Sequence, residues 1–241
     1  ATVRLLEQIG VPEVVTIANN LGIRSPLSQD LSLALGSSSV TLQEITSAYG
    51  VFADQGLWLE PYLITHAKNL NGEIIEQHQF EPRQAMTKEN AYLITNMLMD
   101  VISSGTGRLA KSIGRPLAGK TGTTNSYNDA WFVGYAPNLA TGVWVGFDEV
   151  RTLGRLESGA QAALPIWTQF MEQALRNSPV TTFPIPEGIQ FAQIDTTTGN
   201  LPSKTSRNIG TEVFRKGTEP GKAAPQKANP MDFFEFDRMN S

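Results

Sequence analysis

The stretch Gly114-Arg-Pro-Leu-Ala-Gly-Lys-Thr-Gly-Thr-Thr124 decides the fold, because it fits two motifs that belong to different architectures. Gly114-x-x-x-x-Gly119-Lys120-Thr121 matches the phosphate loop of nucleotide-binding proteins, in which a helix begins at the Lys-Thr pair. Lys120-Thr121-Gly122 also matches a K-T-G triplet that serine acyltransferases carry. The flanking residues have to separate the two interpretations.

The residues after Thr121 favour a strand. Thr121 is followed by Gly-Thr-Thr-Asn-Ser-Tyr-Asn, a poor helix start, and then by the strand-like run Ala130–Tyr135. The next strand-like run, Gly142–Phe147, follows after Ala136-Pro-Asn-Leu139, a connection short enough only for a hairpin. A parallel crossover with its own helix does not fit into this space. The pattern therefore predicts antiparallel strands, and it leaves a nucleotide-binding protein as a distant third possibility.

The residue types of the triplet suit acyl transfer to or from a peptide that ends in a carboxylate. Lys120 supplies a positive charge for that carboxylate, and Thr121 and Thr123 supply hydroxyls on one face of the strand. Gly122 removes a side chain where substrate backbone must approach closely. The backbone N–H of Thr123 is suited to stabilise a developing oxyanion.

The rest of the chain predicts helices around this sheet. The first 55 residues are helical in pattern, and Thr41-x-x-Glu44 is a capping box that opens a helix through Ala53. Residues 57–80 are strand-like, Thr87 caps a further helix, and residues 160–176 form the last one. The helical spacing predicts two buried stripes, Tyr92, Leu93, Asn96, Met97 and Val101 in the helix after Thr87, and Ile166, Trp167, Phe170, Met171 and Leu175 in the last helix. We therefore expect an α/β (α+β) fold, an antiparallel sheet flanked by helices, over residues 1–178. Residues 179–241 hold half of the 14 prolines and predict an extended appendage, with a short hairpin around 189–201 and disorder at 217–230.

Composition excludes several classes of function. The 241 residues carry a net charge of −4, which gives no reason to expect a nucleic-acid partner. The absence of cysteine excludes thiolate metal sites, disulfides and a cysteine nucleophile. His66 and His78 have no acidic partner at useful spacing and are expected to be surface histidines. No metal or other cofactor is predicted, and no stretch approaches the roughly 20 apolar residues of a membrane span.

Around the triplet, the sequence resembles the transpeptidase domain of penicillin-binding proteins, most closely the class A (1A-type) enzymes. The matching stretches run from Ala1 to Asn177 and are specific in combination. They are Leu33-Ala-Leu-Gly36, Val40-Thr41, Ala48-Tyr-Gly-Val-Phe-Ala53, Gly105-Thr-Gly107, Gly119-Lys-Thr-Gly-Thr-Thr-Asn125, Asp129-Ala-Trp-Phe-Val-Gly-Tyr135, Val143-Trp-Val-Gly-Phe-Asp148, Leu153-Gly154 and Ala163-Leu-Pro-Ile-Trp167. The resemblance implies a serine β-lactamase/transpeptidase-like fold, of which this chain supplies the later strands and helices.

The resemblance also implies roles for six residues. Lys120 and Thr123 would take part in catalysis, and Thr121, Gly122, Thr124 and Asn125 would bind substrate. The family's two other motifs, S-x-x-K with the nucleophilic serine and S-x-N, precede K-T-G in the chain, and neither occurs upstream here. Ser126-Tyr-Asn128 and Ser206-Arg-Asn208 have the S-x-N pattern, but both lie after the triplet and are interpreted as coincidences.

We therefore expect this chain to be the C-terminal part of a longer protein whose upstream portion holds the nucleophile. The implied activity is a peptidoglycan D,D-transpeptidase that cross-links D-Ala-D-Ala stem peptides and is acylated by β-lactams. The implied whole protein is also a peptidoglycan glycosyltransferase, at the extracytoplasmic face of the bacterial inner membrane through an anchor outside this chain. Because the nucleophile is absent, an inactive binding or structural module of the same fold stays open as an alternative.

Overall fold

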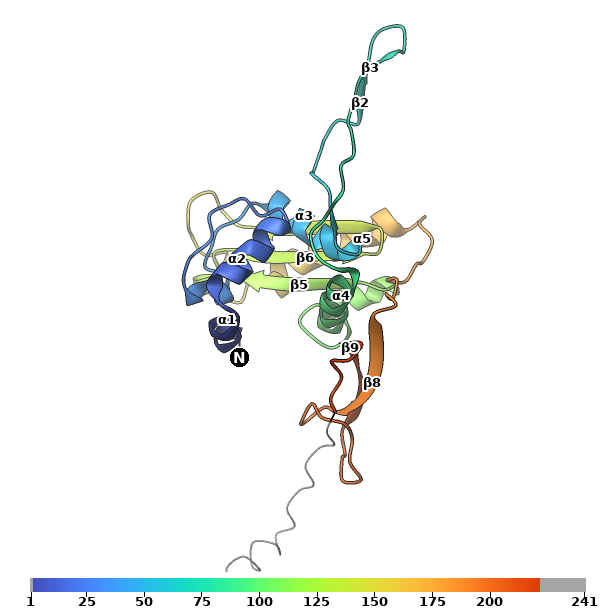
Figure 1. The fold of residues 1–241 in the computed structure, drawn as a ribbon. Coiled ribbons are helices and arrows are strands. Elements are labelled where there is room, and N and C mark those ends of the chain that lie inside the picture. The colour runs from blue at the N-terminus through green and yellow to red at the C-terminus, as the bar shows by residue number, and fades with distance from the viewer. Residues whose placement is uncertain (1, 222–241) are drawn as a thin grey trace, which may run out of the picture. The chain divides into compact units, whose positions relative to one another are not determined.

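The computed structural model describes residues 2–221, which divide into two compact units, residues 2–185 and 186–221. The first unit is built on a three-stranded antiparallel sheet in the order β5–β6–β7, formed by Ala118–Thr123, Ala130–Ala136 and Leu139–Val145 (Figure 1). The predicted hairpin between the last two strands is confirmed, although β7 begins three residues before the expected Gly142 because the connection is a tight turn at Pro137 and Asn138.

Helices cover both faces of this sheet. α3 (Leu42–Ala53) and α4 (Lys88–Ser103) pack on one face, where Tyr135 of β6 meets Tyr49 and Phe52. On the other face, Phe132 contacts Trp167 of α5 (Leu164–Leu175) with ring centroids 4.9 Å apart. The alternation of side chains along β6 thus fills two separate cores. The predicted antiparallel sheet flanked by helices is confirmed.

The remaining elements of the first unit are short. α1 (Thr2–Ile9) and α2 (Val11–Asn20) are separated by Gly10, whose φ of 95° interrupts the helix, and α2 starts with Pro12 in its first turn. Short 3₁₀ helices follow at η1 (Leu31–Leu35), η2 (Arg108–Ile113) and η3 (Asn125–Tyr127), and η4 (Gly159–Ala163) is a π-helical turn.

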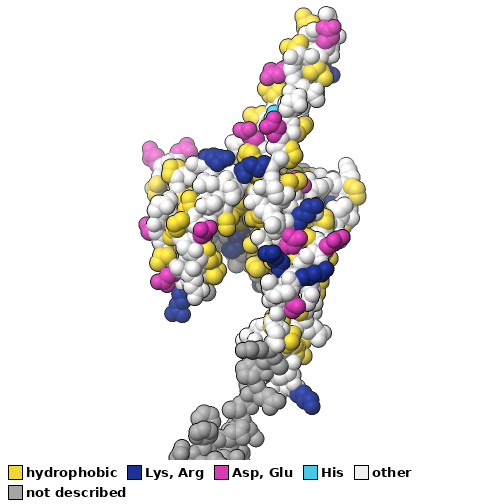
Figure 2. All heavy atoms as spheres, viewed as in Figure 1, with side chains coloured by type: hydrophobic (Ala, Val, Ile, Leu, Met, Phe, Trp, Pro, Cys, Tyr) yellow, Lys and Arg dark blue, Asp and Glu magenta, His cyan; other side chains and the backbone are white. Residues whose placement is uncertain are grey.

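The region expected to be strand-like, residues 57–80, is mostly an arm. Its strands are β1 (Leu57–Trp58), which pairs with β4 (Arg83–Gln84), and β2 (His66–Lys68), which pairs with β3 (Ile74–Gln77). The β2–β3 hairpin projects away from the sheet (Figure 1) and carries apolar side chains on its surface (Figure 2), with Leu63 and Leu70 fully exposed. The strand-like residues there do not extend the central sheet.

Two helices bury a different set of residues from those that their sequence pattern predicts. In α5, Trp167, Met171 and Leu175 are buried as expected, but Ile166 and Phe170 are about half exposed and Leu164 is buried instead. In α4 the buried residues are Ala91, Thr95 and Ile102, whereas Met97 is 62% exposed. Each helix buries only a narrow stripe of residues, which are small or spaced at i, i+4. The apolar side chains beside this stripe therefore stay exposed to solvent.

The second unit contains a hairpin of β8 (Ile189–Asp195) and β9 (Ile209–Arg215). The expected hairpin around 189–201 is therefore longer, because residues 196–208 form the connection rather than the second strand. The described part of the chain divides at residue 185, seven residues after the boundary expected at 178. Disorder was expected at residues 217–230. Of this range, residues 222–230 lie outside the described residues.

The capping box at the start of α3 also forms hydrogen bonds with the loop that follows α2, at Arg24 and Ser25. Thr41 Oγ1 accepts from Glu44 N, and the Glu44 carboxylate accepts from Thr41 N. The same carboxylate accepts from the backbone N–H groups of Arg24 and Ser25 at 2.8 Å and from the Ser25 hydroxyl at 2.6 Å. Burial raises the pKa of Glu44, but these hydrogen bonds from Ser25, Thr41 and Arg24 outweigh it and lower the pKa to about 2.

We expect Glu44→Gln to lower the free energy of unfolding at pH 7 by roughly 1–3 kcal/mol. The donors from Arg24, Ser25 and Thr41 now share two negatively charged oxygens, whereas the glutamine amide has one neutral acceptor oxygen. The lowered pKa means that ionised Glu44 stabilises the fold above the ordinary pKa of 4.5 and loses this effect as the pH falls toward 2. Thermal denaturation of both proteins between pH 7 and pH 2.5 should show the difference in Tm shrinking below pH 4.5. A difference that stays constant over this range would contradict the assignment.

Candidate active site

The Lys120–Thr123 segment lies on β5, one of the two edge strands of the three-stranded sheet. Its register pairs Lys120 with Val133, Thr121 with Phe132, Gly122 with Trp131 and Thr123 with Ala130. Within residues 2–221, β5 pairs with β6 only, so its other edge is open to an extended chain. No helix begins at Lys120 and Thr121, which removes the structural condition for a phosphate loop.

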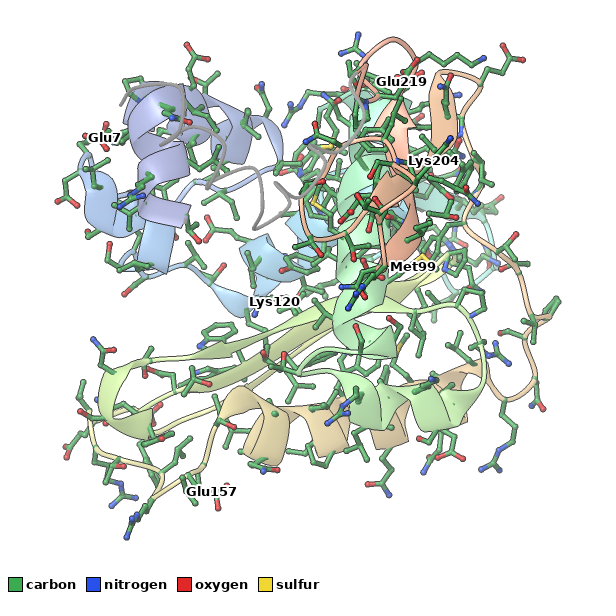
Figure 3. The ribbon with its side chains drawn as sticks, turned by 90° about the horizontal axis from the view of Figure 1, so that it is seen from below. Glu7, Met99, Lys120, Glu157, Lys204 and Glu219 are labelled. Atoms are coloured by element: carbon green, nitrogen blue, oxygen red, sulfur yellow. The ribbon has the colours of Figure 1, made fainter. Side chains whose placement is uncertain are left out.

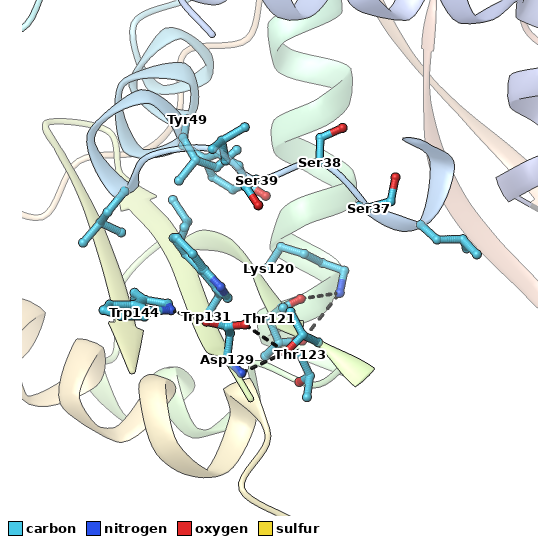
Figure 4. Close-up of a pocket in the computed structure, with 18 residues that line it drawn as sticks. Ser37, Ser38, Ser39, Tyr49, Lys120, Thr121, Thr123, Asp129, Trp131 and Trp144 are labelled. Atoms are coloured by element: carbon cyan, nitrogen blue, oxygen red, sulfur yellow. Dashed lines mark hydrogen bonds between the residues drawn. The ribbon is translucent and has the colours of Figure 1, made fainter. Parts of the chain in front are cut away.

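A pocket of about 630 Å³ opens beside this strand. Three sets of residues line it: the segment Leu35–Val40, one side of α3 with Leu42, Ile45 and Tyr49, and the sheet residues 120–124, 129, 131, 133 and 144. Figure 4 shows Ser37, Ser38 and Ser39 on the side of the pocket away from Lys120 and Thr121. The pocket lining therefore combines apolar side chains with hydroxyl groups, one lysine and one aspartate.

Lys120 presents its charge at the mouth of this pocket. The side chain is exposed, and Nζ donates to the carbonyl oxygen of Thr121 at 2.9 Å and lies 3.5 Å from Thr121 Oγ1. Figure 3 places Lys120 on the opposite side of the sheet from Glu157, a residue of the loop before η4. Lys120 makes no salt bridge with any described acidic residue, so it can pair with an anionic ligand.

The two threonines of the triplet are held by residues distant in sequence. The Thr121 and Thr106 hydroxyls form a hydrogen bond of 2.7 Å, and Thr123 Oγ1 accepts from the Gly159 N–H at 3.0 Å. Because Thr123 Oγ1 accepts this bond, its proton remains available to a substrate oxygen. Thr106 lies in the Gly105-Thr-Gly107 stretch, whose role sequence reasoning did not identify.

Of the two predicted substrate-binding residues that follow the triplet, Thr124 lines the pocket and Asn125 does not. Thr124 lines the pocket, but its hydroxyl donates to Asp129 Oδ2 at 3.1 Å and accepts from Asp129 N at 2.8 Å, so it closes the loop. Asn125 begins the turn η3 and does not line the pocket. Ser126 and Asn128, one of the two S-x-N matches, are also in this loop outside the pocket lining. Ser206 and Asn208 belong to the second unit.

Tyr49, Trp131 and Trp144 also line the pocket, and of these only Trp131 could be proposed from the sequence, as a residue that borders the substrate or belongs to the core. Burial raises the pKa of the Tyr49 hydroxyl to about 12, which keeps it a neutral donor. Trp131 and Trp144 lie beside each other with ring centroids 6.2 Å apart. Within the described residues, no three His, Asp or Glu side chains cluster closely enough to hold a metal ion.

Comparison with known families agrees with this architecture. Residues 9–172 match the penicillin-binding protein transpeptidase domain, and residues 185–226 match the C-terminal domain of penicillin-binding protein 1A. Penicillin-binding protein 1A of Aquifex aeolicus is 38% identical over 91% of this chain and 30% of its own length. That of Pseudomonas aeruginosa is 32% identical over 97% of this chain and 36% of its own length. The chain thus spans about a third of the length of these curated relatives.

Solved structures show the same fold. The crystal structure of penicillin-binding protein 1A from Haemophilus influenzae superposes with a TM-score of 0.86 at 29% identity, covering 93% of this chain and 39% of that one. The PonA1 protein from Mycobacterium tuberculosis in complex with penicillin V gives a TM-score of 0.67 at 27% identity, over 76% of this chain and 55% of that one. The serine β-lactamase/transpeptidase-like fold that the sequence predicts is confirmed.

Proposed function

The chain belongs to the penicillin-binding protein transpeptidase family, and on that premise we propose that it forms one wall of a peptidoglycan D,D-transpeptidase site. The observation that carries the proposal is the open edge of β5. It presents the Lys120 ammonium and the Thr121 and Thr123 hydroxyls beside a 630 Å³ pocket. An extended stem peptide can lie along such an edge, where backbone hydrogen bonds hold it in register.

We assign the roles in this site as follows. Lys120 and Thr121 bind the terminal carboxylate of a D-Ala-D-Ala stem peptide, and the small Gly122 allows the peptide backbone to approach. The Thr123 N–H stabilises the oxyanion that forms when a serine hydroxyl attacks the carbonyl carbon of the penultimate alanine. Thr124 supports the strand from the loop, and Asn125, which does not line the pocket, is assigned no contact with the substrate.

The reaction divides into two acyl transfers. The serine oxygen forms an ester with the penultimate alanine while the peptide nitrogen leaves, protonated, with D-alanine. An amine of a second stem peptide then attacks this ester, which releases the serine and forms the cross-link. A β-lactam enters the same site, but its nitrogen stays tethered after the ring opens, so the ester persists.

The nucleophilic serine belongs, in this proposal, to an upstream portion of the same protein. No S-x-x-K occurs among the 241 residues, and the curated relatives are about three times as long as this chain. We propose that the whole protein is also a peptidoglycan glycosyltransferase that works at the extracytoplasmic face of the inner membrane. No helix of residues 2–221 is long and apolar enough to span a bilayer.

We further propose a functional division of the chain after residue 178, close to the end of the first unit. Residues 1–178 would supply the transpeptidase wall, and residues 179–241 would form a separate appendage. The C-terminal match at residues 185–226 and the division at residue 185 support such an arrangement.

The release of D-alanine tests the function. The full-length protein is incubated with a pentapeptide that ends in D-Ala-D-Ala and with an acceptor amine, and both free D-alanine and the cross-linked product are measured. We expect both, and we expect preincubation with penicillin to abolish them. A full-length protein that binds the peptide without releasing D-alanine would instead support the inactive binding module. Release of D-alanine that penicillin does not inhibit would contradict acyl transfer through a penicillin-sensitive serine.

A further inference from the structure

Asp129 joins the three strands of the sheet at the end nearest the catalytic wall. It precedes β6, its Oδ1 accepts from Trp144 Nε1 of β7 at 2.9 Å, and its Oδ2 accepts from the hydroxyl of Thr124, which follows β5, at 3.1 Å. The backbone adds two bonds, from Asp129 N to Thr124 Oγ1 at 2.8 Å and from Thr124 N to Asp129 O at 3.1 Å. Thr124 and Asp129 are thus bonded to each other through both main chain and side chain.

The loop that these bonds close is strained. Ser126 and Tyr127 have φ values of 63° and 56°, a left-handed conformation that non-glycine residues rarely adopt in succession. Such residues persist only where their surroundings fix them. The four hydrogen bonds between Thr124, Asp129 and Trp144 close the base of this loop, directly after the last paired residues of β5 and β6, Thr123 and Ala130.

We propose that Asp129 is a positioning residue, which fixes the backbone at Thr123 for oxyanion stabilisation. This inference rests on the proposed transpeptidase function. Thr123 is held on one side by the Gly159 N–H, and the next residue, Thr124, is held by Asp129. With both ends fixed, the Thr123 N–H keeps one orientation while the substrate changes from planar to tetrahedral.

A carboxylate at this position accepts from both donors at once. Two donors, the indole N–H of Trp144 and the hydroxyl of Thr124, arrive at different oxygens of Asp129. An asparagine can keep the bond from Trp144 with its one acceptor oxygen, but its NH₂ group then faces Thr124 Oγ1, and the hydroxyl has to turn from donor to acceptor. Asp129→Asn therefore replaces the bond from Thr124 to a charged oxygen with a weaker, neutral bond of reversed direction, with almost no change of volume.

The test is the acylation of the full-length protein by a fluorescent penicillin, with the rate of the covalent step separated from the preceding dissociation constant. For Asp129→Asn we expect the covalent step to slow by about tenfold or more, since small displacements of catalytic groups have large effects on rate. The dissociation constant should change by less than about twofold, because the residues proposed to bind the carboxylate are untouched. Trp144→Phe, which removes the indole donor only, should give a smaller change in the same direction.

Asp148→Asn is the matched control. Asp148 is exposed, follows β7, and accepts no hydrogen bond from another described residue, so this variant should acylate at the wild-type rate. A wild-type protein that is not acylated at all would overturn the proposed function itself. Acylation of Asp129→Asn at the wild-type rate, or an equal loss in binding and in the covalent step accompanied by a lower Tm, would overturn only the positioning role.

Discussion

In the full-length protein, Lys120→Met is expected to lower the second-order rate of acylation by penicillin about 10²–10³-fold, the range for the loss of one preorganised group that stabilises charge. Methionine keeps most of the length of the side chain and removes its charge. Lys120 is exposed, and its only described hydrogen-bond partners are atoms of the adjacent Thr121, so the fold should not change. The loss would thus report on the charge at the pocket mouth. The rate is read from the formation of the labelled adduct over time.

Lys111→Met is the control for this substitution. Lys111 lies in η2, is exposed and does not line the pocket, so its replacement should leave the acylation rate within about twofold of wild type. Unchanged acylation of Lys120→Met would mean that the cation for the substrate carboxylate comes from elsewhere, and the role assigned to β5 would be wrong.

The second large effect concerns Gly159, where η4 meets the sheet. A Cβ at this position would overlap the carbonyl oxygens of Gly122 and Trp131 and lie 3.1 Å from the backbone N of Gly122. These neighbours are backbone atoms of paired strands and cannot rotate away. We expect Gly159→Ala to destabilise the chain by roughly 3 kcal/mol, which lowers Tm by about 6–12 °C for a chain of this size. The Gly159–Thr123 hydrogen bond should be lost as well.

Gly50→Ala is the control, because this substitution is expected to raise the free energy of unfolding rather than lower it. Gly50 lies inside α3, and the nearest atom to an added Cβ is Ala140 Cβ at 4.0 Å. Alanine should therefore stabilise the helix by about 0.5–1 kcal/mol. Thermal denaturation followed by near-UV circular dichroism measures both variants. A Gly159→Ala protein that melts with the wild type would show that η4 does not press against β5 and β6 as described.

The sequence predicted those features that depend on neighbouring residues. Thr41 and Glu44 form the expected capping box, and the short connection at 136–139 forms the expected hairpin, because each is determined within a few residues. The choice between strand and helix after Lys120 was equally local. These signals, together with the combination of family motifs, were sufficient for the fold.

The contacts that shape the candidate site could not be predicted in this way. Thr106 meets Thr121, Trp144 meets Asp129 and Gly159 meets Thr123 across separations of 15, 15 and 36 residues, and no local pattern specifies such pairs. The exposure of Ile166 and Phe170 was missed for a related reason. A helical pattern gives the apolar positions, but the sheet that α5 packs against determines which of them are covered.

The central claim is that Lys120–Thr123 forms one wall of an acylation site whose serine lies outside these 241 residues. Mass spectrometry after incubation with penicillin tests it directly, on the 241-residue chain and on the full-length protein in parallel. We predict no adduct on the chain alone, and on the full-length protein a stoichiometric adduct on a peptide upstream of Ala1. A stoichiometric adduct on a serine within the 241 residues would contradict the account.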